Sequence, residues 1–257
     1  MSIENDKDLL GITRISNVVA LTLKGMREYT RAGMSTWELD QYGAGILKKY
    51  GARPAPALVY GFPGCACISV NNEAAHGIPS PKTILKEGDL VNIDVSAELD
   101  GYYSDNGGSF VVGTDIRHLD PLVQASKDIL YKAIHRVRGG VKVSEIGRVI
   151  ETEAKKRRLK VIKSLCGHGV GRSLHEEPKE IPNFYDRFNT ARFRKNSVVA
   201  IETFISTRAS YTHAKGDGWT EMTGEGGFVA QHEHTIIVTD KDPVILTKAN
   251  DIWMNHS

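Results

Sequence analysis

The sequence has few cysteines and lacks a long apolar segment. Its three cysteines, Cys65, Cys67 and Cys166, are too few and odd in number for a disulfide framework, which indicates a reducing compartment. In a strand, Cys65 and Cys67 would share one face, but one such pair is poor evidence for zinc. No stretch approaches the roughly 18 apolar residues that a membrane helix needs, and segment 1–8 is acidic rather than signal-like. We therefore expect a cytoplasmic protein without a membrane partner.

An excess of charge of either sign is also lacking. Among 257 residues, 33 Lys and Arg oppose 31 Asp and Glu, a formal net charge of +2. This balance gives no electrostatic reason to expect a nucleic-acid partner. The short basic run 155–158 ends a predicted helix, where it complements the helix dipole in solvent. Neither a P-loop nor a dinucleotide-binding glycine fingerprint occurs, which argues against nucleotide chemistry.

Helical and strand patterns follow one another without a flexible linker, so we predict a single domain spanning residues 1–257. Apolar residues at helical spacing predict helices over 5–31 and 36–50, the second starting at a capping box of Ser35 and Glu38. The proline-rich segment 53–56 is expected to break the helix and lead into β structure. The dipeptide Asp100-Gly101 predicts a tight hairpin turn. The remaining expected elements are strands 66–71, 89–98, 102–112, 160–165, 197–206 and 228–239, and helices 117–138 and 143–158.

The order helix, helix, strand, hairpin occurs twice. Segments 31–39 and 138–146 match in Arg, Gly, Glu and an aliphatic residue, and the same register, with a one-residue slip, aligns Asp94 with Glu202. Two such halves folded face to face would bury one antiparallel sheet, with helices outside and the acidic residues on its concave side. The expected fold class is therefore α+β.

Charged side chains occur in or beside several predicted strands, where they are unusual. Strand alternation sends Asp94 to a polar face, and the hairpin returns Asp105 alongside it. Glu202 ends an apolar strand, where an ionised carboxylate is costly unless it is paired or bound to metal. Taken singly, Asp94 and Asp105 fit a solvated strand edge and a turn better than a ligand site, whereas a buried salt bridge is the less favoured alternative for Glu202.

Histidines and one further glutamate extend this set. In segment 230–237, alternation places Glu233 on one face and the flanking His232 and His234 on the other, so Glu233 is the candidate ligand. His168 lies among three glycines, which allow the close backbone approach that suits a ligand site. With Asp94, Asp105 and Glu202, these oxygen and nitrogen ligands are of the types that hold hard and borderline divalent cations. Four carboxylates and one imidazole exceed what one ion needs, which favours two ions about 3.5–4 Å apart.

The combined motifs resemble those of the type I methionine aminopeptidases over nearly the whole chain. The motifs that carry the resemblance are Val70-Asn-Asn-Glu-Ala-Ala-His76-Gly-Ile-Pro79, Asn92-Ile-Asp94-Val, Asp105, Gly167-His168-Gly-Val-Gly171, His175-Glu-Glu-Pro178, Ile201-Glu202 and Gln231-His-Glu233-His-Thr-Ile. The resemblance implies the pita-bread fold, in which two pseudo-symmetric halves share a curved antiparallel sheet flanked by helices. It also implies removal of the N-terminal methionine of peptides and nascent proteins, with a small second residue preferred.

The resemblance assigns roles to the five ligands. Asp105 and Glu233 would bridge two divalent ions, Asp94 would serve the first ion, and His168 with Glu202 would serve the second. The ions could be Co, Mn, Fe or Zn, because oxygen-rich sites accept each of them. The implied protein is a monomer that works in proximity to the ribosome.

The resemblance also assigns catalytic and substrate-binding residues. His76 and His175 would contact the scissile amide, and Glu202 would move a proton to the leaving amine. The methionine pocket would be lined by Phe62, Cys67 and Trp219. The sequence departs from the usual family pattern at Asn106, Leu174, Thr203 and His232, none of which is a ligand position.

Two alternative functions share this pattern. One is an aminopeptidase that cleaves Xaa-Pro bonds, although such enzymes usually carry a separate N-terminal domain for which Asp94 lies too near the start. The other is a non-catalytic binding protein of the same fold, although such proteins typically lose metal ligands and all five are present here. Substrate preference and bound metal distinguish the three.

Overall fold

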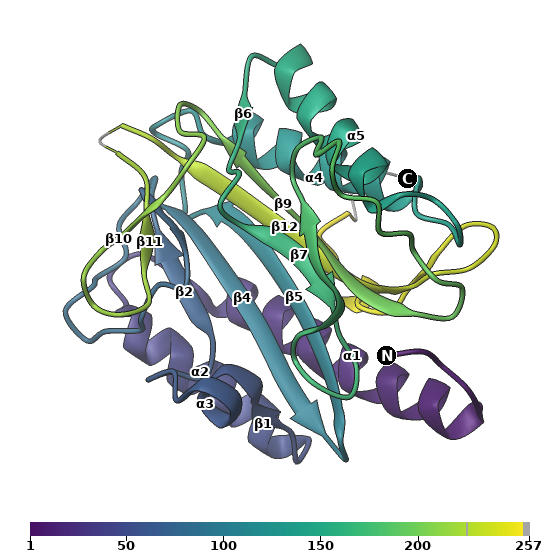
Figure 1. The fold of residues 1–257 in the computed structure, drawn as a ribbon. Helices are drawn as coiled ribbons and strands as arrows, with labels where there is room; N and C mark the ends of the chain where they lie inside the picture. The colour runs from purple at the N-terminus through teal and green to yellow at the C-terminus, as the bar shows by residue number, and fades with distance from the viewer. Residues whose placement is uncertain (225, 254–257) are drawn as a thin grey trace.

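The computed structural model describes residues 1–224 and 226–253. A ten-stranded antiparallel sheet forms its centre, and its main path runs in the order β1-β4-β5-β12-β9-β7-β8 (Figure 1). Strand β2 also pairs with β4, β6 with β9, and β13 with β12, while β10, β11 and β3 form a small second sheet. The strands are β1 (Arg53–Pro54), β2 (Cys67–Val70), β3 (Glu73–Ala75), β4 (Leu90–Leu99), β5 (Tyr102–Val111), β6 (Lys160–Val161), β7 (Cys166–Gly169), β8 (Glu176–Pro182), β9 (Val198–Ser206), β10 (His213–Ala214), β11 (Glu221–Met222), β12 (Val229–Ile237) and β13 (Val244–Ile245).

Two hydrophobic cores lie behind this sheet, one for each half of the chain. The first packs one face of β4 against the apolar face of α1, and the second packs β9 and β12 against α4, while α5 packs against α4 and β8 (Figure 1). The strand order places the β4–β5 hairpin of the first half beside the β12–β9 pair of the second half, as expected for an α+β sheet built from two similar halves. The helices are α1 (Asp6–Tyr29), α2 (Thr36–Lys49), α3 (Ala55–Tyr60), α4 (Asp120–Ile134), α5 (Val143–Lys156) and the 3-10 helix η1 (Lys248–Asn250).

Local sequence signals are confirmed where they are strong. The side chain of Ser35 accepts a hydrogen bond from the backbone N–H of Glu38, and the Glu38 carboxylate accepts one from the backbone of Ser35, which completes the predicted capping box. Asp100 and Gly101 have φ values of 53° and 81°, so both take the left-handed conformation that a tight two-residue hairpin turn requires. The predicted helices and strands in both halves lie within a few residues of those observed, apart from the shorter β6 and α4.

Three predictions are wrong or incomplete. Segment 53–56 leads into the short strand β1 as predicted, but the chain then forms the short helix α3, whose first turn accommodates Pro56, before β2 begins. Cys65 and Cys67 do not share a strand face, since β2 begins at Cys67. Strands β7 and β8 were not predicted, because their glycine- and proline-containing sequences lack an alternating apolar pattern.

The described helices include none that is long and apolar enough to cross a membrane.

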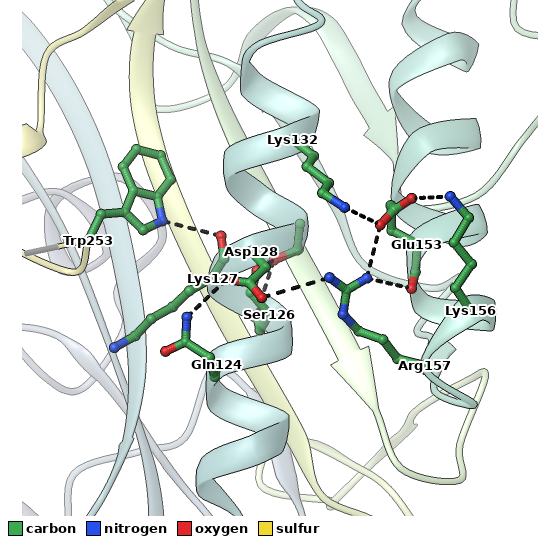
Figure 2. A network of polar contacts seen from close by, with 10 residues as sticks. Gln124, Ser126, Lys127, Asp128, Lys132, Glu153, Lys156, Arg157 and Trp253 are labelled. Atoms are coloured by element: carbon green, nitrogen blue, oxygen red, sulfur yellow. Dashed lines mark hydrogen bonds and ion pairs between the residues drawn. The ribbon is translucent and has the colours of Figure 1, made fainter. Parts of the chain in front are cut away.

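The basic run 155–158 does more than end a helix in solvent, because two of its residues pair with Glu153. Lys156 Nζ donates to Glu153 Oε1 at 2.6 Å, and Arg157 Nη1 donates to Glu153 Oε2 at 2.9 Å. Lys132 of α4 donates to the same carboxylate at 2.6 Å, so Glu153 joins α4 to α5 (Figure 2).

We expect Glu153→Gln to lower the free energy of unfolding by about 1 kcal/mol at pH 7, because its three cations are partly exposed and screened. Hydrogen bonds from Lys132, Lys156 and Arg157 lower the pKa of Glu153 from 4.5 to about 2. A depressed folded-state pKa adds stability above the unfolded pKa, and this contribution is lost as the pH falls toward 2. Urea unfolding of both proteins from pH 7 to pH 3 measures the difference, which should shrink below about pH 4.

The matched control is Glu145→Gln on the same helix, whose carboxylate pairs with Arg148 in one half-exposed contact at 3.4 Å. This control should change stability little, because exposed single pairs contribute a few tenths of a kcal/mol. Equal effects of the two substitutions, or a Glu153→Gln effect that does not depend on pH, would show that the cluster contributes nothing specific.

Candidate active site

One cavity of about 350 Å³ lies on the face of the sheet opposite the helices α1 and α4. Its volume is typical of a site for a small ligand or a side chain. The cavity contains all five predicted metal ligands, which come from the five strands β4, β5, β7, β9 and β12. All other predicted site residues line it as well: Phe62, Cys67, His76, His175 and Trp219.

Strand pairing brings the five predicted ligands together. Glu202 of β9 lies directly opposite Glu233 of β12, and the β4–β5 hairpin sets Asp105 opposite Ser96, one alternation step beyond Asp94. Asp105, His168 and Glu233 each offer a ligand atom within 4.8 Å of the other two, and among the described residues they form the group that could hold a metal ion. Asp94 and Glu202 flank this group in the same cavity.

The histidine of this group is prepared to bind a cation. His168 is 5% exposed, and its Nδ1 lies 3.0 Å from the backbone oxygen of Gly169, to which it can donate. That bond leaves the lone pair on Nε2, which faces Asp105 Oδ2 at 3.7 Å. Burial lowers the pKa of His168 to about 3, so the ring is neutral at physiological pH, as metal ligation requires.

The carboxylates of the site repel one another. Burial raises the pKa of Asp94, and it raises those of Asp105, Glu202 and Glu233 well above their ordinary values. The negative charges of the neighbouring carboxylates add to the last three shifts. Oδ1 of Asp105 and Oε1 of Glu233 are buried without a hydrogen-bond partner in the described part of the chain. Divalent cations would supply both the missing partners and the opposing charge, so the residues fit a metal centre.

Gln231 holds two of these carboxylates from the side. Its Nε2 donates to Glu202 Oε2 at 3.3 Å and to Glu233 Oε2 at 3.1 Å. Asn92 Nδ2 donates to Gln231 Oε1 at 2.7 Å, so the amide cannot flip without losing that bond and turning its oxygen toward two carboxylates. Gly107 makes room for this side chain, because a Cβ there would overlap the Gln231 amide.

The alternation prediction for β12 is confirmed. His232 is fully buried on the helix side of the sheet, where its Nδ1 lies 2.9 Å from Ser126 Oγ of α4. Its cross-strand neighbour Thr203 lies 3.2 Å from the same hydroxyl. His234 Nδ1 contacts Thr247 Oγ1 at 2.7 Å. Neither histidine lines the cavity. His232 and Thr203, two of the positions that differ from the usual family pattern, instead share a polar contact with Ser126 on the opposite face of the sheet.

The other two positions that differ from the usual family pattern, Asn106 and Leu174, lie in different places. Asn106 is fully buried, donates to Val95 O at 3.2 Å and accepts from Asn250 at 3.0 Å. Leu174 is 3% exposed and lines the cavity directly before His175. Asn106 therefore supports the sheet, whereas Leu174 shapes the site.

The rim of the cavity carries the two remaining histidines. His76 follows β3 with a φ of 56°, a conformation uncommon for residues other than glycine, and its side chain lines the cavity. His175 precedes β8, and its ring lies 4.1 Å from that of His168 between centroids. Burial and the charge of His76 lower the pKa of His175. A neutral His175 imidazole can donate or accept a hydrogen bond to a ligand.

The other end of the cavity is apolar and aromatic. The rings of Phe62 and Trp219 meet edge to face, with centroids 5.2 Å apart and planes at 87°. Cys67 is buried opposite Asp94 in the β2–β4 pair, and burial raises the pKa of its thiol well above 9.0, so the sulfur is an uncharged surface. A soft, flexible side chain suits such walls.

Among the residues that line or adjoin the site and were not predicted from the sequence are Tyr60, Cys166, Phe204 and Gln231. Phe204 could have been found, because it lies two residues after Glu202 in the same strand and so shares its face. Cys166 could have been found in the same way from His168 in β7. Tyr60 had no such signal, since the helix that carries it was not predicted.

Comparisons with known proteins agree on one family. The model of metallopeptidase family M24 matches residues 11–240. Methionine aminopeptidase 2 of Bacillus subtilis (strain 168) is 48% identical over 248 residues, which cover 96% of this chain and 100% of that protein. The crystal structure of methionine aminopeptidase from Thermotoga maritima matches with a TM-score of 0.91 at 32% identity, over 96% of this chain and 99% of that one. The corresponding enzyme from Rickettsia prowazekii matches with a TM-score of 0.90 at 34% identity, over 96% and 100%.

Proposed function

Because this chain belongs to metallopeptidase family M24 and is a methionine aminopeptidase, we propose that its cavity removes N-terminal methionine with two divalent ions. The observation that carries this proposal is the meeting of four buried carboxylates and one neutral imidazole beside an aromatic pocket. Asp94, Asp105, His168, Glu202 and Glu233 would hold the ions. The two unpartnered carboxylate oxygens belong to Asp105 and Glu233, two of these residues.

In this proposal, the ions and the protein side chains supply different parts of the reaction. Two bound divalent ions supply a water acidic enough to attack near neutral pH, together with positive charge for the substrate's carbonyl oxygen. Glu202 accepts the proton of this water and passes it to the leaving amine. His175 donates a hydrogen bond to the carbonyl oxygen as it becomes negative, and His76 contacts the scissile amide.

Substrate selection follows from the two ends of the cavity. Phe62, Cys67 and Trp219 hold the methionine side chain through aromatic and sulfur contacts. The free α-amine lies near Asp94, so the enzyme acts from the chain end. A preference for a small second residue belongs to the same proposal.

The cellular setting is part of the same proposal. The natural substrates are peptides and nascent proteins that begin with methionine, processed in the cytoplasm by a monomer close to the ribosome. The free state of Cys65, Cys67 and Cys166 agrees with a reducing compartment. The single catalytic domain would span residues 1–257.

Hydrolysis of Met-Gly-Met against a Xaa-Pro peptide tests this function. We expect the enzyme supplied with Mn²⁺, Fe²⁺, Co²⁺ or Zn²⁺ to release methionine from Met-Gly-Met and to leave the Xaa-Pro peptide intact. A chelator should remove the activity, and the divalent ion should restore it. Preference for the Xaa-Pro peptide, or purified protein that binds no divalent ion and hydrolyses neither peptide, would overturn the proposal.

A further inference from the structure

Tyr60 contacts a rim histidine of the site directly. It is the last residue of α3, which ends at Gly61 in the left-handed conformation, with a φ of 74°. The Tyr60 side chain lines the cavity, and its Oη lies 2.7 Å from Nδ1 of His175. The two rings are tilted by 52°, with centroids 5.7 Å apart. The Tyr60 hydroxyl is thus hydrogen-bonded to one of the two ring nitrogens of His175.

This contact determines where the proton of a neutral His175 resides. A phenol O–H is a stronger hydrogen-bond donor than a neutral imidazole N–H, so the Tyr60 hydroxyl donates and Nδ1 accepts. Burial raises the pKa of Tyr60, which keeps its donor proton in place. A neutral imidazole carries a single proton, so that proton lies on Nε2. The ring of His168 also packs against that of His175, with centroids 4.1 Å apart.

We propose that Tyr60 is a positioning residue that holds His175 as its Nε2–H tautomer, with this N–H available to the carbonyl oxygen of the substrate. The inference rests on the proposed function for the role of His175. Among the described residues, Tyr60 makes its side-chain hydrogen bond and its ring contact with His175. The group it orients, His175, donates to the carbonyl oxygen on which negative charge develops during the reaction.

Tyr60→Phe removes the hydroxyl and keeps the ring. We expect kcat for Met-Gly-Met to fall about tenfold with KM nearly unchanged, because the lost hydrogen bond orients a donor that acts mainly in the transition state. The matched control is Tyr50→Phe, an exposed tyrosine at the end of α2 that does not line the cavity, and it should leave both constants unchanged.

¹⁵N NMR of ¹⁵N-histidine-labelled, Zn²⁺-loaded protein measures the tautomer of His175 independently of enzyme activity. In the parent protein we expect the Nδ1 of His175 to be unprotonated and the Nε2 to be protonated, and in Tyr60→Phe a mixture of tautomers. The His175 signals are identified by their loss in His175→Gln. A proton on Nδ1 in the parent protein, or an unchanged spectrum in Tyr60→Phe, overturns the inference even if kcat falls. If the parent protein does not cleave Met-Gly-Met, the proposed function fails, while the spectrum still decides the tautomer.

Discussion

Glu233→Ala is expected to remove activity and bound metal together. Glu233 is 1% exposed, lies directly opposite Glu202 and belongs to the group whose ligand atoms meet within 4.8 Å. Loss of a partner that merely orients a ligand typically costs about 10–100-fold in metal affinity or activity, so loss of a bridging ligand should cost more than about 100-fold. Metal content by mass spectrometry and the initial rate on Met-Gly-Met measure the two losses.

The matched control is Glu28→Ala, a largely exposed glutamate of α1 outside the cavity. It should retain the metal content and rate of the parent protein. If Glu233→Ala instead keeps both ions and the full rate, Glu233 is no ligand, and the assignment of the bridging carboxylates fails. Isothermal titration with Mn²⁺ adds a measure of affinity that does not depend on turnover.

His175→Ala should separate catalysis from metal binding. His175 lines the cavity, but it lies outside the group of described residues whose ligand atoms converge. Because its donor acts on charge that develops in the transition state, we expect kcat to fall by about 10²–10³, or ~3 kcal/mol, with the metal content unchanged. Stopped assays at saturating Met-Gly-Met, together with metal analysis, measure both quantities.

An exposed histidine of β10, His213, provides the comparison for this variant, because it does not line the cavity. His213→Ala should behave like the parent protein. Loss of metal in His175→Ala would contradict the proposed role and place His175 among the ligands. A rise in KM with unchanged kcat would assign it to ground-state binding instead.

Much of the fold and of the candidate site follows from local rules. Alternation in segment 230–237 separates Glu233 from His232, and the structure places the first in the cavity and the second against Ser126. The turn at Asp100-Gly101 follows equally from a dipeptide whose conformational preference needs no distant partner. Such signals are readable because each depends on residues a few positions apart.

Other features could not be predicted from the sequence, for a physical reason. Prolines before Tyr60 can begin a helix as readily as they can end one. The sequence therefore could not predict α3 or the contact of its Tyr60 with His175. The amide of Gln231 needs Asn92 and the space above Gly107 to reach two carboxylates. None of these partners is a neighbour in the sequence.

By itself, the sequence determined which side chains share a strand face, where the hairpin turns, and that a set of carboxylates needs cations. Only the tertiary structure decided that Asp94, Asp105, His168, Glu202 and Glu233 converge from five strands into one cavity, and that Tyr60 and Gln231 act on its residues. The reason is that periodicity depends on neighbouring residues. Convergence depends on strand register, which is set in part by pairing between segments more than 100 residues apart, as between Gly108 of β5 and His232 of β12.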